Sequence, residues 1–142
     1  MIKLVFCGSN KFYDKIVDIK DRMIKLYGDY LDIVLPAYCD TPVEEMSDFK
    51  YEMLLTGHFK KIESADMVVI FDFDGYVGKS TCMEIAYAYA HKKPIIGLCP
   101  PEDKSINFIF NEFLYKDIMY IKEFDQDKLI DIVDNWFIRA DD

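Results

Sequence analysis

Short apolar runs alternate along the chain with longer stretches in which apolar residues recur at helical spacing. The runs predict buried strands over residues 2–7, 30–36, 65–73, 93–99 and 118–124. The remaining stretches predict helices over residues 11–27, 43–63, 80–92 and 125–139, and a short helix over 105–113. Strand and helix therefore alternate along the whole chain, which predicts a three-layer α/β domain built around a parallel sheet.

The third run, ADMVVIFDF, is apolar on both faces, as expected for a parallel strand covered by helices on both sides. We expect right-handed crossovers and the strand order 2-1-3-4-5. In such a sheet a ligand binds at the carboxyl ends of the strands, where the order reverses between the first and third strands. Gly8 and Ser9 should therefore face the same crevice as the turn from Asp74 to Thr81.

That turn contains the segment GYVGKST, which is similar to a phosphate-binding loop. A Walker loop needs a glycine five residues before Gly78, but Phe73 occupies that position, so the turn is not a P-loop. Gly75 and Gly78 still allow the backbone to approach a ligand closely. Ser80 and Thr81 can cap the following helix, whose free N–H groups favour an anion. The alternative is an ordinary strand-to-helix turn with a serine cap.

Glu84, in the same predicted helix, has two possible interpretations. The pattern T-x-x-E from Thr81 to Glu84 matches a capping box, in which the carboxylate binds a backbone amide. The other interpretation places the carboxylate in the crevice, beside a bound anion. There it could attack or stabilise an electrophilic carbon, and the anomeric carbon of a nucleotide fits because the sugar adjoins the phosphate.

Composition narrows the choice of partners. The chain has 142 residues, consistent with a single domain over residues 1–142, and its net charge of −9 makes nucleic acid an unfavourable partner. The four cysteines (Cys7, Cys39, Cys82 and Cys99) form no C-x-x-C pair and no zinc-type spacing with histidine. We expect reduced thiols in a cytoplasmic protein, with no metal and no cofactor. We expect no signal peptide, because the apolar run at the start is short, and no apolar run approaches the roughly 20 residues of a membrane helix.

Three segments together carry a family resemblance: VFCGSN, ESADMVVI and GYVGKSTCMEIAYAYAHKKPIIGL. In this order they resemble the nucleoside 2-deoxyribosyltransferase superfamily, nearest its 2'-deoxynucleoside 5'-phosphate N-hydrolase branch. The resemblance implies a flavodoxin-like, or Rossmann-like, fold and a homodimer. It also implies a nucleoside or nucleotide substrate, whose N-glycosidic bond is cleaved by a glutamate nucleophile, with transfer of the sugar to water or to another base.

The resemblance also implies roles for individual residues. Glu84 would be the nucleophile, and the substrate or its phosphate would be bound by Gly8, Ser9, Asp74, Gly75, Gly78, Ser80, Thr81 and Ser105. Ser80 and Thr81 would hold the 5' end. Ser105, in PPEDKS, corresponds to a serine that the hydrolase branch uses for phosphate, although it could also cap the short helix that follows.

Two positions depart from the pattern of the hydrolase branch. Val5 replaces a tyrosine of the first strand, and His58 replaces an aspartate ahead of the third strand. A histidine can act as an acid or base near neutral pH. We expect His58 to be the acid–base or orienting partner of Glu84, with an inflection near neutral pH, unless it is an ordinary polar residue. Further residues could take over missing roles or contact a base: Tyr13, Tyr38, Asp72, Asp74, Tyr76 and Tyr87.

Three functions are compatible with these residues. The first is an enzyme that cleaves or exchanges an N-glycosidic bond. The second is a non-catalytic nucleotide-binding or sensor module of the same fold, favoured by the missing tyrosine and aspartate. A phosphoribohydrolase of the cytokinin-activating type is a further alternative, because its glycine-threonine-glutamate turn is similar. Glu84 facing the pocket would favour an enzyme, whereas Glu84 bound to backbone amides as a cap would favour the module.

Overall fold

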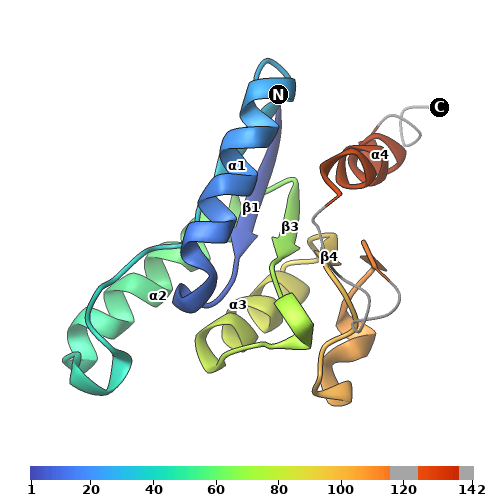
Figure 1. Cartoon of the computed structure of the whole chain (residues 1–142). Helices are drawn as coiled ribbons and strands as arrows, with labels where there is room; N and C mark the ends of the chain where they lie inside the picture. Colours follow the sequence, from blue (N-terminus) through green and yellow to red (C-terminus); the bar gives the residue numbers. More distant parts are fainter. Residues whose placement is uncertain (116–124, 138–142) are drawn as a thin grey trace.

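A five-stranded parallel sheet forms the centre of the protein (Figure 1). The computed structural model describes residues 1–115 and 125–137. The strands are β1 (Ile2–Cys7), β2 (Leu31–Val34), β3 (Met67–Ile70), β4 (Ile95–Gly97) and β5 (Glu112–Phe113). Their order is β2-β1-β3-β4-β5 and every neighbouring pair is parallel, which confirms the predicted sheet and strand order.

Helices cover both faces of this sheet. The α-helices are α1 (Tyr13–Tyr27), α2 (Asp48–Glu63), α3 (Lys79–Ala90) and α4 (Gln126–Phe137). Short 3-10 helices are η1 (Asn10–Phe12), η2 (Val43–Glu45), η3 (Phe73–Gly75) and η4 (Lys104–Ile109). In the described part of the chain, no helix is long and apolar enough to cross a membrane.

The side chains of β1 alternate between two apolar cores. Leu4 and Phe6 pack with residues of α1 and α4, whereas Val5 and Cys7 pack with residues of α2 and α3. This alternation follows from the two-residue period of a strand, and it gives the three layers that the sequence predicts. The last side chain of β1, Cys7, therefore points toward the layer formed by α2 and α3.

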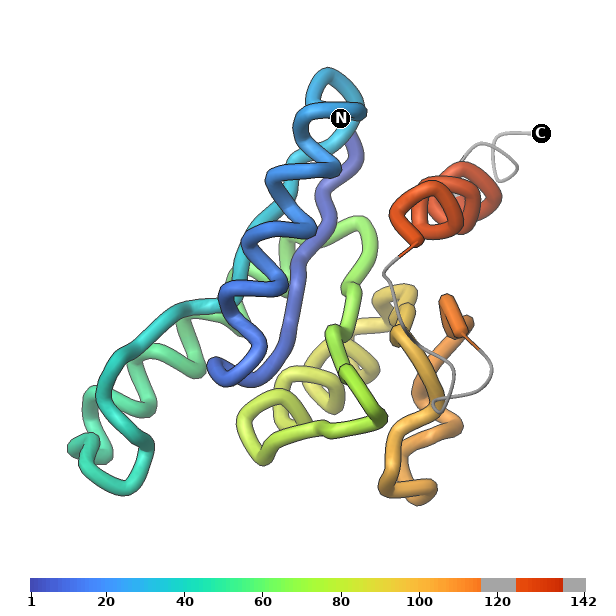
Figure 2. Tube along the Cα trace, in the orientation of Figure 1, coloured from blue at the N-terminus to red at the C-terminus, as the bar shows by residue number. Residues whose placement is uncertain are grey.

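The order reversal lies where β1 pairs with β3, with Cys7 opposite Ile70. The chain leaves β1 through Gly8, where a Cβ atom would lie 2.7 Å from Cδ1 of Ile16, so a side chain here would require the Ile16 side chain to move. The segment that connects β2 to α2 extends away from the sheet beside α2 (Figure 2). These connections surround the carboxyl end of β1.

Two predicted elements differ from the structure. The helix expected over residues 43–63 is divided into η2 and α2, because Ser47 caps α2 by accepting a hydrogen bond from the Lys50 amide at 3.2 Å. The short helix expected over 105–113 is instead η4 followed by β5. Asn111 fixes this arrangement: its amide donates to the Ile95 carbonyl, and its side chain accepts from the Ile95 amide. The strand expected over 118–124 lies outside the described residues.

Candidate active site

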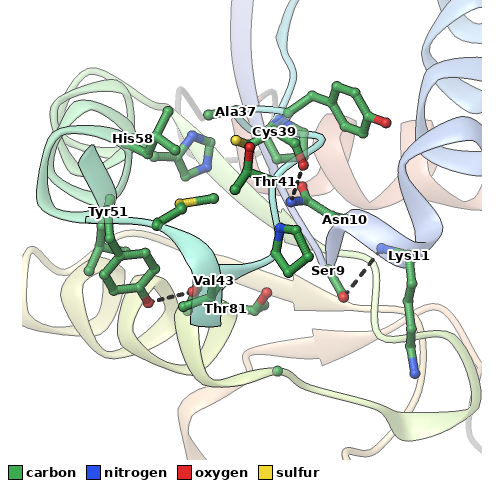
Figure 3. A pocket seen from close by; sticks show the side chains of 18 of the residues that line it. Ser9, Asn10, Lys11, Ala37, Cys39, Thr41, Val43, Tyr51, His58 and Thr81 are labelled. Atoms are coloured by element: carbon green, nitrogen blue, oxygen red, sulfur yellow. Dashed lines mark hydrogen bonds between the residues drawn. The ribbon is translucent and has the colours of Figure 1, made fainter. Parts of the chain in front are cut away.

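A pocket of about 640 Å³ lies at the carboxyl end of β1, between the segment that follows β2, helix α2 and the start of α3, and its size is typical of small-molecule sites. It is lined by residues 8–11, 36–44, Met46, Tyr51, Leu54, Leu55, His58, Gly78, Ser80, Thr81 and Glu84. Figure 3 shows Ser9 and Lys11 on one side of this pocket, with Tyr51 and His58 on another. Gly8 and Gly78 therefore lie at one rim of the sheet, as the sequence predicts.

The structure brings most of the predicted site residues to this pocket. They are Gly8, Ser9, His58, Gly78, Ser80, Thr81 and Glu84. Asp74, Gly75 and Ser105 are not among its lining residues.

These three residues serve the local backbone in the structure. Asp74 and Gly75 form the η3 turn with positive φ angles of 57° and 80°. The Gly75 carbonyl accepts a hydrogen bond from the Glu102 amide at 2.8 Å. The Ser105 hydroxyl donates to Oδ1 of Asp103 at 2.7 Å, so it belongs to the start of η4.

Glu84 is not a helix cap. The N-cap of α3 is Gly78, which makes no side-chain cap, and Thr81 lies inside the helix. A capping box needs a serine or threonine at the N-cap and the glutamate three residues later, so Thr81 and Glu84 cannot form one. The Glu84 side chain is buried, and its Oε2 atom has no hydrogen-bond partner among the described residues. The interpretation of Glu84 as the carboxylate of a capping box is therefore excluded.

Ser80 has a different partner from the one expected. Its Oγ atom lies 2.6 Å from the hydroxyl of Tyr51, which comes from α2. This hydrogen bond joins the first turn of α3 to α2 across the pocket wall. Because Ser80 does not cap the helix, the free amides at the start of α3 remain available beside a hydroxyl that Tyr51 positions.

Three buried side chains meet behind the pocket: Cys7, His58 and Glu84. Nε2 of His58 lies 3.3 Å from Sγ of Cys7 and 3.5 Å from Oε2 of Glu84. His58 reaches this position because it lies on the buried face of α2, one turn before Ile62. Glu84 lies on the buried face of α3, together with Thr81, Ile85 and Ala88.

Burial determines the protonation of this cluster. Loss of solvent raises the pKa of Glu84 to about 7, although the Cys7 thiol and the charge of Lys61 partly oppose this change. Burial, assisted by Lys61, lowers the pKa of His58 to about 4. Burial and the nearby Glu84 raise the pKa of Cys7 well above its ordinary value. Near neutral pH, His58 is therefore neutral, Cys7 is a thiol, and Glu84 is close to its midpoint.

This result corrects the expectation that His58 titrates near neutrality. A histidine does so when it is solvated, but His58 is only 2 % exposed and its charged form is penalised. The group that titrates near neutrality in this pocket is Glu84. The contact between His58 and Glu84 is therefore one between a neutral imidazole and a carboxyl group.

Sequence reasoning missed several residues of the site. Tyr51, Leu54 and Leu55 line the pocket beside the predicted His58, and their spacing places all four on one face of α2. That spacing was a detectable signal. The sequence around Cys7 predicts only a reduced thiol in a buried strand, and nothing in it indicates that His58 and Glu84 lie beside Cys7.

The residues considered as replacements for the missing tyrosine and aspartate do not gather at the pocket. Tyr38 lines the pocket and stacks on Tyr13, with ring centroids 4.6 Å apart. Asp72 is buried, accepts hydrogen bonds from the amides of Leu98 and Cys99, and does not line the pocket.

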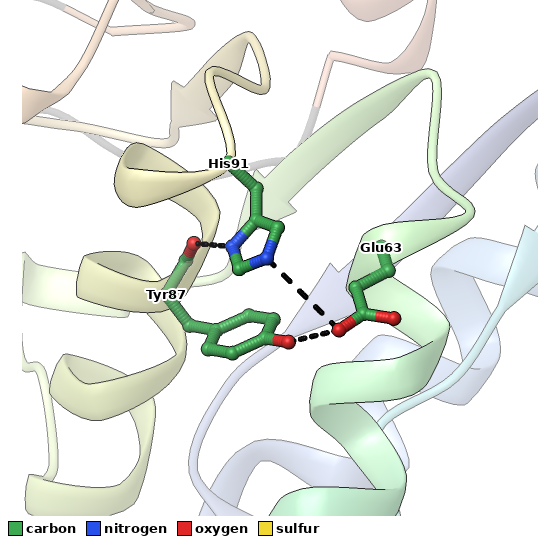
Figure 4. A network of polar contacts seen from close by, with 3 residues as sticks. All are labelled: Glu63, Tyr87 and His91. Atoms are coloured by element: carbon green, nitrogen blue, oxygen red, sulfur yellow. Dashed lines mark hydrogen bonds and ion pairs between the residues drawn. The ribbon is translucent and has the colours of Figure 1, made fainter.

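Tyr76 and Tyr87, considered as contacts for a base, do not line the pocket. Tyr87 donates a hydrogen bond to Glu63 and stacks on His91 (Figure 4). It also stacks on Phe59. These contacts give Tyr87 a packing role between α2 and the end of α3.

The fold is shared with solved structures at low sequence identity. A 2-deoxyribosyltransferase from Bacillus psychrosaccharolyticus aligns with a TM-score of 0.58 and 16 % identity, covering 89 % of this chain and 95 % of that protein. The CMP N-glycosidase of Clostridium botulinum aligns with a TM-score of 0.52 and 17 % identity, and the alignment covers 93 % of this chain and 98 % of that protein. These likenesses show a common fold.

A third structure, a conserved protein from Enterococcus faecalis V583, aligns with a TM-score of 0.54 and 18 % identity. That alignment covers 72 % of this chain, which spans 65 % of the length of that protein. No protein-family model and no curated protein matches the sequence.

Proposed function

We propose that this protein cleaves, or transfers the sugar at, the N-glycosidic bond of a nucleoside or nucleoside 5'-monophosphate, with Glu84 as the nucleophile. One observation carries the proposal: the Glu84 carboxyl group lies at the wall of a pocket, buried and not engaged as a helix cap. A carboxylate in that position is suited to an oxocarbenium-like transition state, because it stabilises developing positive charge on the sugar. The fold shared with a 2-deoxyribosyltransferase and a CMP N-glycosidase supports the same reaction class.

The proposed reaction has two steps. A carboxylate oxygen of Glu84 bonds to the anomeric carbon while the bond from that carbon to the base nitrogen breaks. The bonding electrons leave with the base, which takes up a proton. Water or a second base then attacks the anomeric carbon, breaks the ester and regenerates the Glu84 carboxylate.

His58 acts in this proposal as a positioning residue. Its Nε2 atom lies 3.5 Å from Oε2 of Glu84, and the neutral imidazole can orient the carboxyl group without adding a charge. Orientation matters because small displacements of a reacting group cost about 10²-fold in rate. The sequence leaves an acid–base role and an orienting role open for His58, and the proposal takes the orienting role.

The start of α3 binds the 5' end of the substrate in the proposal. Gly78 is the N-cap of this helix, and Ser80 and Thr81 lie in its first turn, where free amides and the helix dipole favour a phosphate. Gly8 and Ser9 lie at the end of β1 on the same pocket, and they would approach the sugar. Asp74, Gly75 and Ser105 lie outside this arrangement.

We further propose that the protein is a homodimer, as the family resemblance implies. Large apolar side chains are exposed, among them Phe49 at 72 % and Phe108 at 71 %, and a second copy could cover such residues. Light scattering at micromolar concentration tests this directly. A dimer mass is expected, whereas a monomer mass would contradict the proposal.

A screen for release of free base tests the proposed function. Nucleosides and nucleoside monophosphates should be incubated with the protein in chelator-treated buffer, with and without an acceptor base. Release without an acceptor indicates hydrolysis, and exchange only with an acceptor indicates transfer. A protein that binds nucleotides by calorimetry but releases no base from any of them would instead be the nucleotide-binding module.

A further inference from the structure

The buried cluster behind the pocket has the chemical composition of a metal site. It offers a thiol from Cys7, an imidazole nitrogen from His58 and a carboxylate oxygen from Glu84, all within 4.8 Å of one another. Sulfur, nitrogen and oxygen donors of this kind suit Zn²⁺ and related cations rather than Mg²⁺ or Ca²⁺, which prefer oxygen alone.

Two of the three distances between these atoms are close to those of a tetrahedral centre. Zinc bonds of about 2.0–2.3 Å place neighbouring tetrahedral ligands roughly 3.3–3.8 Å apart. Nε2 of His58 lies 3.3 Å from Sγ of Cys7 and 3.5 Å from Oε2 of Glu84. Two edges of the tetrahedron are therefore already close to their required lengths.

The cluster is held by three separate elements and contains an unused acceptor. Cys7 ends β1, His58 lies on α2 and Glu84 lies on α3. Oε2 of Glu84 is buried without a hydrogen-bond partner among the described residues, which is costly for a carboxyl oxygen unless a ligand completes it. His58 and Glu84 also line the pocket, so a fourth position is open to water or to a small molecule.

We propose that Cys7, His58 and Glu84 bind one divalent cation of the zinc class, and that this cation blocks the reaction proposed for Glu84. On binding, the Cys7 thiol releases its proton to solvent, and the thiolate and carboxylate together neutralise the charge of the cation. The inhibitory effect rests on the proposed function, because the metal occupies the carboxylate that would attack the sugar. Sequence spacing could not reveal this site, since its ligands are 51 and 26 residues apart.

Binding of Co²⁺ and Zn²⁺ to the metal-free full chain tests the site. Co²⁺ should give thiolate-to-metal charge-transfer absorption at one equivalent, and Zn²⁺ should displace it. Cys7→Ser should abolish this absorption, and His58→Ala should weaken Zn²⁺ binding at least tenfold by calorimetry. Cys39→Ser, at a pocket cysteine outside the cluster, and His91→Ala, at an exposed histidine, should bind as the wild type does.

Several outcomes would overturn the site. In the first, the wild type shows neither Co²⁺ absorption nor Zn²⁺ binding. In the second, Cys7→Ser binds the metal as the wild type does. The three side chains would then form a hydrogen-bonded cluster without metal. Cys7→Ala serves the same purpose if Cys7→Ser does not fold, with the melting temperature as the check on folding.

The inhibitory effect is measured separately, as base release with chelator and with one equivalent of Zn²⁺. Adding Zn²⁺ should lower the rate of base release at least tenfold, and chelator should restore the rate. Base release that Zn²⁺ does not change would contradict the inhibition. Zn²⁺ binding in a protein that never releases base would support the site and contradict the proposed enzymatic function alone.

Discussion

Nε2 of His58 lies 3.5 Å from Oε2 of Glu84, and the two side chains are 2 % and 10 % exposed. This contact joins α2 to α3 behind the pocket. It is not an ordinary ion pair, because burial lowers the pKa of His58 to about 4 and raises that of Glu84 to about 7. The pair therefore presents a neutral imidazole to a carboxyl group that titrates close to neutral pH.

Replacement of His58 tests its positioning role. His58→Ala should lower the rate of base release by about 10²-fold, because the Glu84 carboxyl loses the group that orients it. The pH–rate profile in chelator-treated buffer should keep its inflection near neutrality, since that inflection belongs to Glu84. His91→Ala is the matched control and should react as the wild type does. Loss of the neutral inflection in His58→Ala alone would assign it to the histidine and contradict this interpretation.

The hydrogen bond between Tyr51 and Ser80 gives a prediction about phosphate. Tyr51→Phe removes the hydroxyl that lies 2.6 Å from Oγ of Ser80. A lost hydrogen bond of about 1 kcal/mol corresponds to roughly fivefold in affinity, and the loss should affect a nucleoside monophosphate but not the free nucleoside. Calorimetry with both ligands measures this, with the exposed Tyr89→Phe as control. Equal wild-type affinities for the two ligands would contradict phosphate binding at the start of α3.

Asp72 predicts how stability depends on pH. Burial raises its pKa from 3.8 to about 7, despite hydrogen bonds from Leu98 and Cys99. The folded state therefore binds the proton more tightly than the unfolded state, so this contribution to stability is complete below about pH 4 and is lost as the pH rises to about 7. The loss is on the order of 4 kcal/mol for a shift of this size.

Asp72→Asn should remove that loss. The amide oxygen can still accept from Leu98, and the neutral side chain does not titrate. Urea unfolding at about pH 4 and about pH 8 should show a smaller decrease in stability for this variant than for the wild type. Asp74→Asn, at the exposed neighbour, should retain the wild-type decrease. An identical pH dependence in Asp72→Asn and the wild type would refute the assignment.

Regular patterns explain which parts of the fold the sequence predicts. β1 is predicted over its full range because an apolar run stops at Gly8, and the strand order follows from the alternation with helices. β5 has only two residues, Glu112–Phe113, which is too short to show a period. Its place in the sheet depends on the pairing of Asn111 with Ile95, a contact between segments that local sequence does not reveal.

The sequence also predicts some parts of the candidate site and not others. Glu84 and the Gly78 turn could be found because their residues are close in sequence. The alternative of a capping box could be removed only with the structure, which begins α3 one residue after Gly78. The meeting of Cys7, His58 and Glu84 depends on the packing of a strand and two helices. Their shifted pKa values follow from burial, and the burial of a single side chain cannot be predicted from the local sequence alone.

The most direct test of the central proposal compares Glu84→Gln with the wild type in chelator-treated buffer, measuring base release and melting temperature on the same samples. The amide cannot form the sugar ester, so base release should be nearly abolished. The melting temperature should stay at or above that of the wild type, because a neutral group replaces a buried carboxyl group and no cap is lost. Glu52→Gln, at an exposed residue of α2, is the control and should leave both quantities unchanged. Wild-type base release by Glu84→Gln would contradict the assignment of this residue as the nucleophile.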